Sequence, residues 1–134
     1  WGHDISPEEN QYEAGLGFAI SYKKNVDFIG KRTLLKIKNQ TPKKKFLMMS
    51  LKDNKPGFPL LLHDEPILFN GKIIGRTTSG NYSFNFNKNM AFGYVNTSPK
   101  IDGGEFEIEV EKKKYKAIIE KKPLHDPDNR IIKN

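Results

Sequence analysis

The stretch Asn70-Gly71-Lys72-Ile73-Ile74-Gly75-Arg76-Thr77-Thr78-Ser79-Gly80 combines a tight turn, a short strand and a run of small residues. Asn-Gly is the strongest two-residue signal for a type I′ hairpin, because both central residues of that turn need a positive φ. Apolar residues flank the turn, so the sequence predicts a hairpin from about Pro66 to Arg76. Gly75 and Gly80 predict a bulge, a bend, or the close approach of another backbone or a ligand.

Further short strands are predicted on both sides of this hairpin, because apolar residues recur in short runs or at every second position. Six or seven such strands with turn signals between them are typical of a mainly β protein, an antiparallel barrel or jelly roll that hides its edges by closing. Tyr82, Phe84 and Phe86 alternate with polar residues and are interpreted as a core face, with a base-stacking platform as the alternative. The predicted strands are Phe46–Leu51, Leu60–His63, Met90–Val95, Glu105–Val110 and Tyr115–Glu120, with the β pattern continuing through Asn81–Asn89.

The first 43 residues form a separate α+β lead-in segment in this interpretation. Tyr12–Ile20 is apolar with alternating glycines and predicts a strand, with a short helix as the alternative. Lys31–Lys38 predicts a short helix, and Asp27 is expected to cap it by accepting from the N–H groups of its first turn. A basic linker follows at Asn39–Lys45, after which the hydrophobic period changes from helical to alternating. We therefore divide the chain into residues 1–43 and 44–134.

The composition sets limits on partners and chemistry. The formal net charge is +7, but only three of the 23 basic residues are Arg. Nucleic-acid sites favour Arg for bidentate and stacked contacts, so a mostly solvated Lys-rich surface is the preferred interpretation. A free-standing basic β-barrel that binds single-stranded nucleic acid remains the alternative function. The chain has no cysteine, which fits a reducing compartment and excludes disulfides and a thiolate nucleophile.

No motif for independent catalysis is found. His3, His63 and His125 lie far apart in sequence and outside any HExxH spacing, so no metal site is expected. Ser79 lies in Thr-Ser-Gly rather than in Gly-x-Ser-x-Gly, so no nucleophile elbow is expected. The glycines between Gly71 and Gly80 match neither a dinucleotide fingerprint nor a P-loop. We therefore expect no catalytic residues in this chain.

Seven phrases, in order and at family-like spacing, resemble the C-terminal part of the glycine-cleavage T-protein (aminomethyltransferase) superfamily. The match is closest to the folate-binding end of dimethylglycine and sarcosine dehydrogenases, and Trp-Gly-His-Asp and His-Asp-Glu-Pro-Ile-Leu point to that branch. The phrases are Trp1–Ile5, Tyr12–Phe18, Asp27–Lys31, Glu65–Leu68, Ile74–Gly80, Ala91–Val95 and Pro123–Pro127.

The resemblance implies a division of labour within a longer protein. Residues 1–43 would be the end of a central folate-binding region, and residues 44–134 a C-terminal barrel and tail. Tetrahydrofolate would be shared with an N-terminal folate domain that holds the catalytic carboxylate, and FAD would occupy a further domain of the dehydrogenases. The partners would be these domains and a small methylamine substrate. The isolated piece, which starts at Trp1 without an initiator Met, would be an inactive fragment from a bacterial cytosol or a mitochondrial matrix.

The resemblance also suggests which residues face the folate. The Trp1–Asp4 loop and Thr78-Ser79-Gly80 would line the cavity, with an aromatic ring for stacking and hydroxyl or backbone donors for carboxylates. Arg76 would meet the glutamate tail of the folate or else form a surface ion pair. The barrel would exclude water and protect an iminium-type intermediate from hydrolysis. The candidate cofactor-binding residues are Trp1, His3, Asp4, Arg76, Thr78, Ser79 and Gly80.

Overall fold

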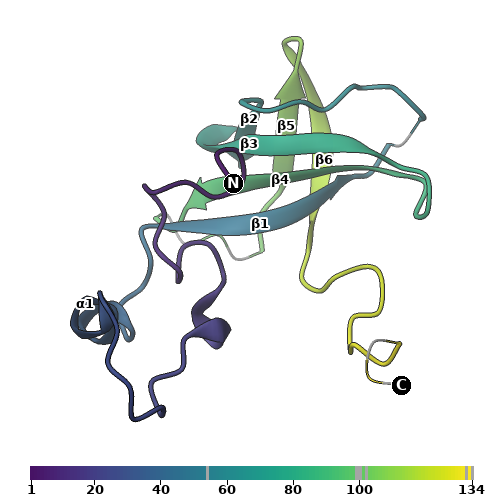
Figure 1. The fold of residues 1–134 in the computed structure, drawn as a ribbon. Coiled ribbons are helices and arrows are strands. Elements are labelled where there is room, and N and C mark those ends of the chain that lie inside the picture. Colours follow the sequence, from purple (N-terminus) through teal and green to yellow (C-terminus); the bar gives the residue numbers. More distant parts are fainter. Residues whose placement is uncertain (54, 99–100, 102, 132, 134) are drawn as a thin grey trace.

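The predicted hairpin forms two neighbouring strands in the wall of a closed antiparallel barrel (Figure 1). A computed structural model describes residues 1–53, 55–98, 101, 103–131 and 133. Within them the strand order is β1-β4-β3-β2-β5-β6, and β6 pairs back with β1, so the sheet has no free edge. The mainly β barrel class is confirmed. The strands are β1 (Lys44–Leu51), β2 (Pro66–Phe69), β3 (Lys72–Ser83), β4 (Lys88–Asn96), β5 (Phe106–Val110) and β6 (Lys113–Glu120).

The turn between β2 and β3 has the predicted backbone conformation. Asn70 and Gly71 both adopt a positive φ, of 49° and 78°, as a type I′ turn requires. The register of β2 with β3 shifts between Ile67 and Leu68, which leaves Ile74 as the extra residue of a bulge beside Gly75. A bulge increases local twist and bends the strand, which helps β3 to curve around the barrel.

The close approach predicted at the glycines is also confirmed. A Cβ added to Gly75 would lie 1.9 Å from the carbonyl oxygen of Tyr94 in β4. A Cβ on Gly80 would lie 2.6 Å from Cβ of Leu61. These two positions therefore let β4 and the 60–65 segment pack directly against the β3 backbone.

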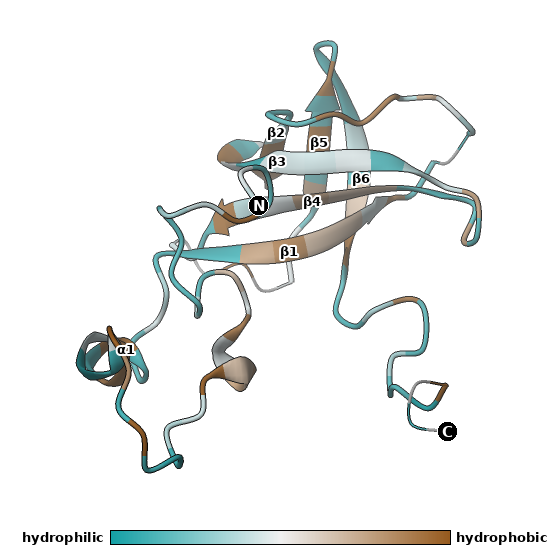
Figure 2. Cartoon of the chain, viewed as in Figure 1, coloured by the Kyte–Doolittle hydropathy of each residue, from teal (hydrophilic) through white to brown (hydrophobic). Residues whose placement is uncertain are grey.

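Alternate residues of each strand point inward and fill the barrel. Met49, Ile67, Val95 and Ile108 are completely buried. The interior also holds Thr77, whose hydroxyl accepts from Glu65 N (2.9 Å) and donates to the Leu62 carbonyl (2.8 Å). Figure 2 shows the apolar residues concentrated on the strands and fewer of them in the loops and the tail. The buried hydrophobic cluster is Leu47, Met49, Leu51, Leu61, Ile67, Phe69, Ile74, Ala91, Val95, Phe106, Ile108, Val110 and Ala117.

The lead-in segment differs from its prediction. Residues 11–15 form turns and Gly17–Ala19 forms the 3-10 helix η1, so the predicted strand at Tyr12–Ile20 is wrong. Gly15 adopts φ 74°, a left-handed conformation that ends extended pairing at this point. The strand that the apolar pattern favoured also has no neighbouring strand to pair with among the described residues of this segment. The alternative, a short helix, is met only by the three residues of η1.

The predicted helix exists as α1 (Lys31–Ile37), but its predicted cap does not. The carboxylate of Asp27 accepts from Phe28 N at 3.0 Å, and the N-cap position is Gly30 with φ 89°. Asp27 lies too far before the first turn to reach its N–H groups. No helix in the described part of the chain has both the length and the apolar content needed to cross a membrane.

Two predictions for the barrel also fail. β3 ends at Ser83, and Phe84 at the following turn is 78% exposed, so Tyr82–Phe86 is not a core face. The chain reverses there through Asn87, which adopts a positive φ. The Leu60–His63 segment is not a strand, and its Leu61 is buried by packing on Gly80. Apolar residues in a loop that covers a barrel end follow the same short pattern as a strand.

Candidate functional site

Asp4 connects the lead-in segment to the middle of β3. Its Oδ1 accepts a hydrogen bond from Thr78 Oγ1 (2.5 Å) and another from Ser79 Oγ (2.8 Å). Neighbouring residues of a regular strand point to opposite faces. The register of β3 with β4 shifts between Thr77 and Ser79, so a second bulge at Thr78 turns both hydroxyls toward the same carboxylate.

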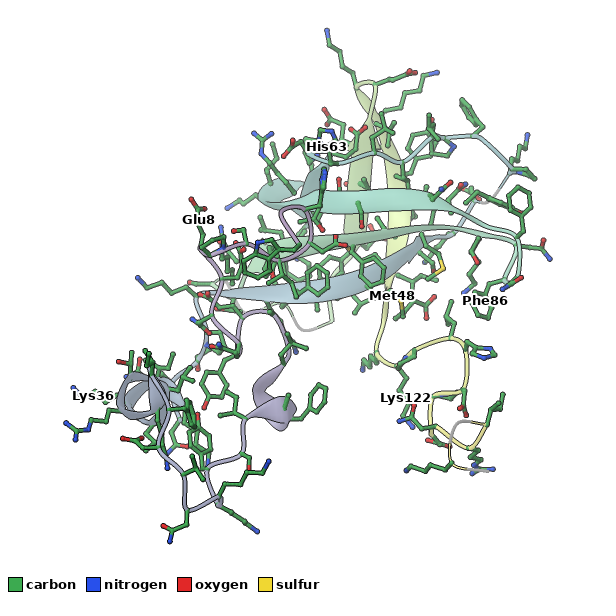
Figure 3. The ribbon with its side chains drawn as sticks, in the orientation of Figure 1. Glu8, Lys36, Met48, His63, Phe86 and Lys122 are labelled. Carbon is green, nitrogen blue, oxygen red and sulfur yellow. The ribbon has the colours of Figure 1, made fainter. Side chains whose placement is uncertain are left out.

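The other predicted site residues surround this contact without joining it. Trp1 is 88% exposed, and the His3 ring centroid lies 6.1 Å from that of His63, a loop residue labelled in Figure 3. Arg76 is exposed, and its side chain has no ion pair or hydrogen bond within the described residues. The space beside Gly80 is filled by Leu61. The structure thus brings together Asp4, Thr78 and Ser79 only.

Tyr94 is a residue of this surface that the sequence reasoning missed. It pairs with Arg76 in the β3–β4 register, and its ring lies 5.0 Å from both Phe46 and the Lys44 ammonium. Its hydroxyl is buried and has no hydrogen-bond partner among the described residues. Burial, with nearby carboxylates led by Glu9, raises the pKa of Tyr94 to about 12. The small-large alternation of Ala91 to Val95 was the available signal, since it places the large side chains outward.

Removing this hydroxyl should not weaken the fold. We expect Tyr94→Phe to raise the free energy of unfolding by about 1 kcal/mol, because an unsatisfied buried hydroxyl costs about that much. Urea unfolding followed by circular dichroism measures it. Tyr12→Phe is the matched control. The Tyr12 hydroxyl lies 2.5 Å from that of Tyr22, so its removal should break a hydrogen bond and lower the stability. A loss of stability in Tyr94→Phe as large as that of the control would contradict the assignment.

A second link joins the lead-in to the barrel through an ion pair. Lys44 Nζ lies 2.5 Å from Glu9 Oε1, and Ser6 donates from its hydroxyl (2.6 Å) and its N–H (2.8 Å) to Glu9 Oε2. The hydrogen bonds from Lys44 and Ser6 lower the pKa of Glu9 to about 2. The backbone adds a third link, because Phe46 N donates to the Glu13 carbonyl at 2.9 Å.

The Glu9 pair predicts acid sensitivity. The folded pKa lies below the unshifted value of 4.5, so the contribution is complete well above that pH and is lost as the pH falls toward 2. We expect the stability difference between the wild-type chain and Glu9→Gln to shrink between pH 5 and pH 2.5. Urea unfolding at each pH measures it, and a constant difference would show that Glu9 does not titrate in this window.

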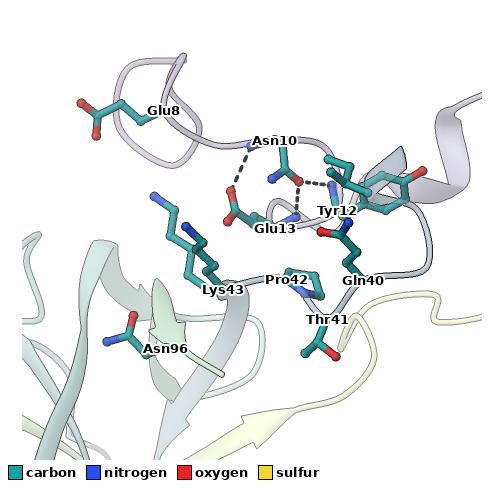
Figure 4. A pocket seen from close by; sticks show the side chains of 11 residues that line it. Glu8, Asn10, Tyr12, Glu13, Gln40, Thr41, Pro42, Lys43 and Asn96 are labelled. Carbon is teal, nitrogen blue, oxygen red and sulfur yellow. Dashed lines mark hydrogen bonds between the residues drawn. The ribbon is translucent and has the colours of Figure 1, made fainter. Parts of the chain in front are cut away.

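A polar cavity of about 500 Å³ lies between the lead-in and the start of β1 (Figure 4). Glu13 is buried there, and its Oε2 accepts from Asn10 N at 3.2 Å. The Asn10 side chain accepts from the N–H groups of Tyr12 (3.0 Å) and Glu13 (3.1 Å). Lys43 also lines the cavity. These hydrogen bonds all join residues of the lead-in, and they hold the turn at residues 11–15 in place.

The lead-in also carries an apolar groove of about 450 Å³. Val26 and Phe28 line it and are themselves exposed, by 68% and 39%. Isolated apolar residues at a surface are normal, but a contiguous set that lines a groove marks a contact surface. The apolar lining consists of Leu16, Ala19, Ile20, Val26, Phe28 and Leu34.

Within the part of the chain that the structure describes, no group of three or more His, Cys, Asp or Glu side chains is placed to hold a metal ion. The geometry therefore defines a small closed β-barrel with a lead-in segment fastened across its outer face by Asp4, Glu9 and Glu13.

Comparison with known proteins shows which family this small β-barrel belongs to. Residues 44–126 match the family described as glycine cleavage T-protein C-terminal barrel domain, and the chain belongs to it. The chain is 35% identical over 130 residues to an aminomethyltransferase of Symbiobacterium thermophilum, covering 97% of this chain and 34% of that protein. It is 36% identical over 126 residues to human mitochondrial dimethylglycine dehydrogenase, covering 92% of this chain and 14% of that protein.

A solved structure agrees with these matches. The glycine cleavage system aminomethyltransferase T of Bartonella henselae superimposes with a TM-score of 0.73 at 25% identity, covering 88% of this chain and 32% of that one. The chain thus spans about a third or less of the relatives that it matches. It is the C-terminal barrel domain found in aminomethyltransferase-like proteins and in dimethylglycine dehydrogenases.

Proposed function

We propose that the barrel, together with residues 1–43, helps to close a tetrahydrofolate cavity in a longer folate-dependent aminomethyltransferase or demethylating methylamine dehydrogenase. Residues 1–43 form the end of the central folate-binding region, and residues 44–134 form the C-terminal barrel and tail. The piece contributes no catalytic residue of its own. The catalytic carboxylate lies in an N-terminal folate domain, and FAD, in the dehydrogenase branch, in a separate domain.

The contact of Asp4 with Thr78 and Ser79 is the observation that carries this proposal. It holds the Trp1–Asp4 loop against the small-residue segment of β3, so that the two candidate binding segments share one surface. Both segments were chosen as folate-facing by resemblance alone, although 74 residues separate Asp4 from Thr78. Two segments that line the same cavity must lie side by side, and the direct contact between the Trp1–Asp4 loop and β3 meets this requirement.

The side chains on this surface have suitable chemistry. The exposed Trp1 ring offers a face for a pterin or aminobenzoyl group. Arg76 is an exposed cation two positions from Thr78 on β3, and guanidinium groups bind carboxylates such as a glutamate tail in bidentate fashion. The barrel would exclude water from the reacting carbon and so protect an iminium-type intermediate.

The apolar groove on the lead-in supports the domain division. Leu16, Val26 and Phe28 lie on its surface, and no element of the described part of the chain covers them. A segment of about 40 residues is too short to bury a core of its own. We propose that the remainder of the central folate-binding region covers this groove in the longer protein, which would operate in the bacterial cytosol or the mitochondrial matrix on a small methylamine.

Calorimetry of the longer protein with tetrahydrofolate tests the proposal. We expect binding, and we expect Arg76→Ala combined with Ser79→Ala to weaken it at least tenfold, since each variant removes a polar group from the cavity wall. Arg130→Ala is the control, because Arg130 is exposed in the tail and pairs there with Asp128 at 3.4 Å. Absence of folate binding would refute the function, and unchanged affinity in the double variant would refute this site.

A further inference from the structure

The outer surface of the barrel has two chemically different sides. Inward residues of β1 and β4, such as Leu47 and Val95, are buried, so the alternate residues face outward. Four of these outward residues are large and apolar, and all are half-buried. Figure 2 shows β1 and parts of β4 in the colours of apolar residues. The four residues, named here the outer strip, are Phe46, Met48, Met90 and Phe92.

The members of the outer strip form one continuous patch. Met48 pairs with Phe92 across β1 and β4, and Phe46 stacks on Phe92 with ring centroids 5.4 Å apart. Met90 follows at the next outward position of β4. Figure 3 shows the Met48 side chain on the β1 side of the barrel that faces the viewer.

The outer face of β5, and of β6 as far as Lys116, is charged. The outward residues of β5 and β6 pair as Glu107 with Lys116 and Glu109 with Lys114. Opposite charges across a strand pair are typical of a solvated face. The contrast shows that the outer strip is not the ordinary outer face of this barrel.

The outer strip has a polar rim on two sides. On β3, Ser79 pairs with Phe92 and donates to Asp4. On β6, Glu120 pairs with Met48 and accepts from Ser50 (2.5 Å) and Lys88 (3.0 Å). An aromatic and methionine-rich centre inside a polar rim is the usual anatomy of a protein contact surface.

The lead-in already covers one end of this surface. Glu13 is hydrogen-bonded to the backbone of Phe46, and Asp4 is fixed beside Phe92 through Ser79. Trp1 therefore lies at the outer face of β3 and β4 (Figure 1). Any polypeptide joined to Trp1 arrives at the outer strip within a few residues, because an extended residue spans about 3.3 Å.

We propose that the outer strip is the docking surface for the polypeptide that precedes Trp1 in the longer protein. The inference deepens the proposed function and rests on it in one respect, that this chain continues upstream. The aminomethyltransferase relative of which this chain covers 34% has ample sequence for such an occupant. Docking continues the existing contact between the lead-in and the barrel, and it removes the exposed parts of these four half-buried apolar side chains from water.

Methionine oxidation tests this docking without any substitution. The chain has three methionines, of which Met48 and Met90 lie in the outer strip and Met49 is fully buried inside the barrel. Hydrogen peroxide converts exposed methionine to the sulfoxide, and tandem mass spectrometry gives the rate at each position. We expect Met48 and Met90 to react faster than Met49 in the 134-residue chain. In the longer protein we expect both rates to fall at least tenfold, toward that of Met49.

The controls separate the possible occupants. Guanidinium-unfolded protein gives the upper limit of each rate, and Met49 gives the lower limit. Equal rates for Met48 and Met90 in the two proteins would overturn the proposal. So would protection that depends on the concentration of the 134-residue chain, which indicates a second copy, or protection that needs added tetrahydrofolate, which indicates a ligand. The oxidation assay contains no folate, so its result does not depend on folate binding. If the longer protein protected both methionines but bound no folate, the docking proposal would stand and only the proposed function would be refuted.

Discussion

Gly75→Ala is expected to prevent the barrel from closing. The added Cβ would lie 1.9 Å from the carbonyl oxygen and 2.9 Å from the carbonyl carbon of Tyr94. Both atoms belong to the backbone of the strand that pairs with β3, so no side-chain rotation relieves the overlap. β3 and β4 would have to separate at the point where Gly75 pairs with Val95. We expect a loss above the roughly 1–3 kcal/mol of ordinary overpacking, which is a large share of a domain's stability.

Guanidinium unfolding of the wild-type chain and of the Gly75→Ala variant tests this expectation. Near-ultraviolet circular dichroism measures the tertiary packing of each. Gly57→Ala is the matched control, because Gly57 has φ 71° and nothing within 4 Å of its added Cβ. The control should lose about 1–2 kcal/mol, the cost of a left-handed alanine. If Gly75→Ala lost no more than Gly57→Ala, the close approach of β3 and β4 would be wrong.

The sequence predicts the barrel well because its signals are local. Asn70-Gly71 specifies a two-residue turn, and Phe106, Ile108 and Val110 alternate strictly, so both hairpins follow from neighbouring residues. The failed strand prediction in the lead-in depends instead on tertiary contacts. Tyr12–Ile20 has the apolar content of a strand but finds no strand to pair with among the described residues of the lead-in.

Part of the candidate site could also be predicted. Asp4, Thr78 and Ser79 were selected from separate motifs, and the structure joins them. The alternation of small and large residues predicts that Tyr94 points outward, but its position beside Arg76 depends on the β3–β4 register. Register depends on the bulge at Thr78, and a bulge that needs no glycine leaves no mark in the sequence.

The second large effect is expected at Thr77, inside the same stretch. Its hydroxyl is buried, accepts from Glu65 N and donates to the Leu62 carbonyl. Thr77→Val keeps the shape and removes both bonds, which leaves the Glu65 N–H and the Leu62 carbonyl without this partner. A polar group left unpaired costs about 1–3 kcal/mol where it is fully buried. We therefore expect a loss of about 2–3 kcal/mol, the lower part of the range for two groups, because water reaches the half-buried Glu65 and the exposed Leu62.

Thr77→Ser is the control, because it keeps the hydroxyl and loses one methyl group, at a cost of about 1 kcal/mol. Hydrogen exchange separates the two variants, since the Glu65 amide should exchange faster in Thr77→Val and remain protected in Thr77→Ser. Equal exchange would mean that another group holds that amide.

The consequence extends to the candidate site, because Thr77 immediately precedes the bulge at Thr78. The backbone bonds from Thr77 N to the Glu65 carbonyl (2.9 Å) and from Asp64 N to the Thr77 carbonyl (2.7 Å) fix the loop on this strand. Thr77 thereby fixes where the bulge begins, and the bulge aims two hydroxyls at Asp4. If this order of dependence is right, Thr77→Val in the longer protein weakens folate binding without touching a residue that would contact the ligand. Thr77→Ser should leave the affinity unchanged.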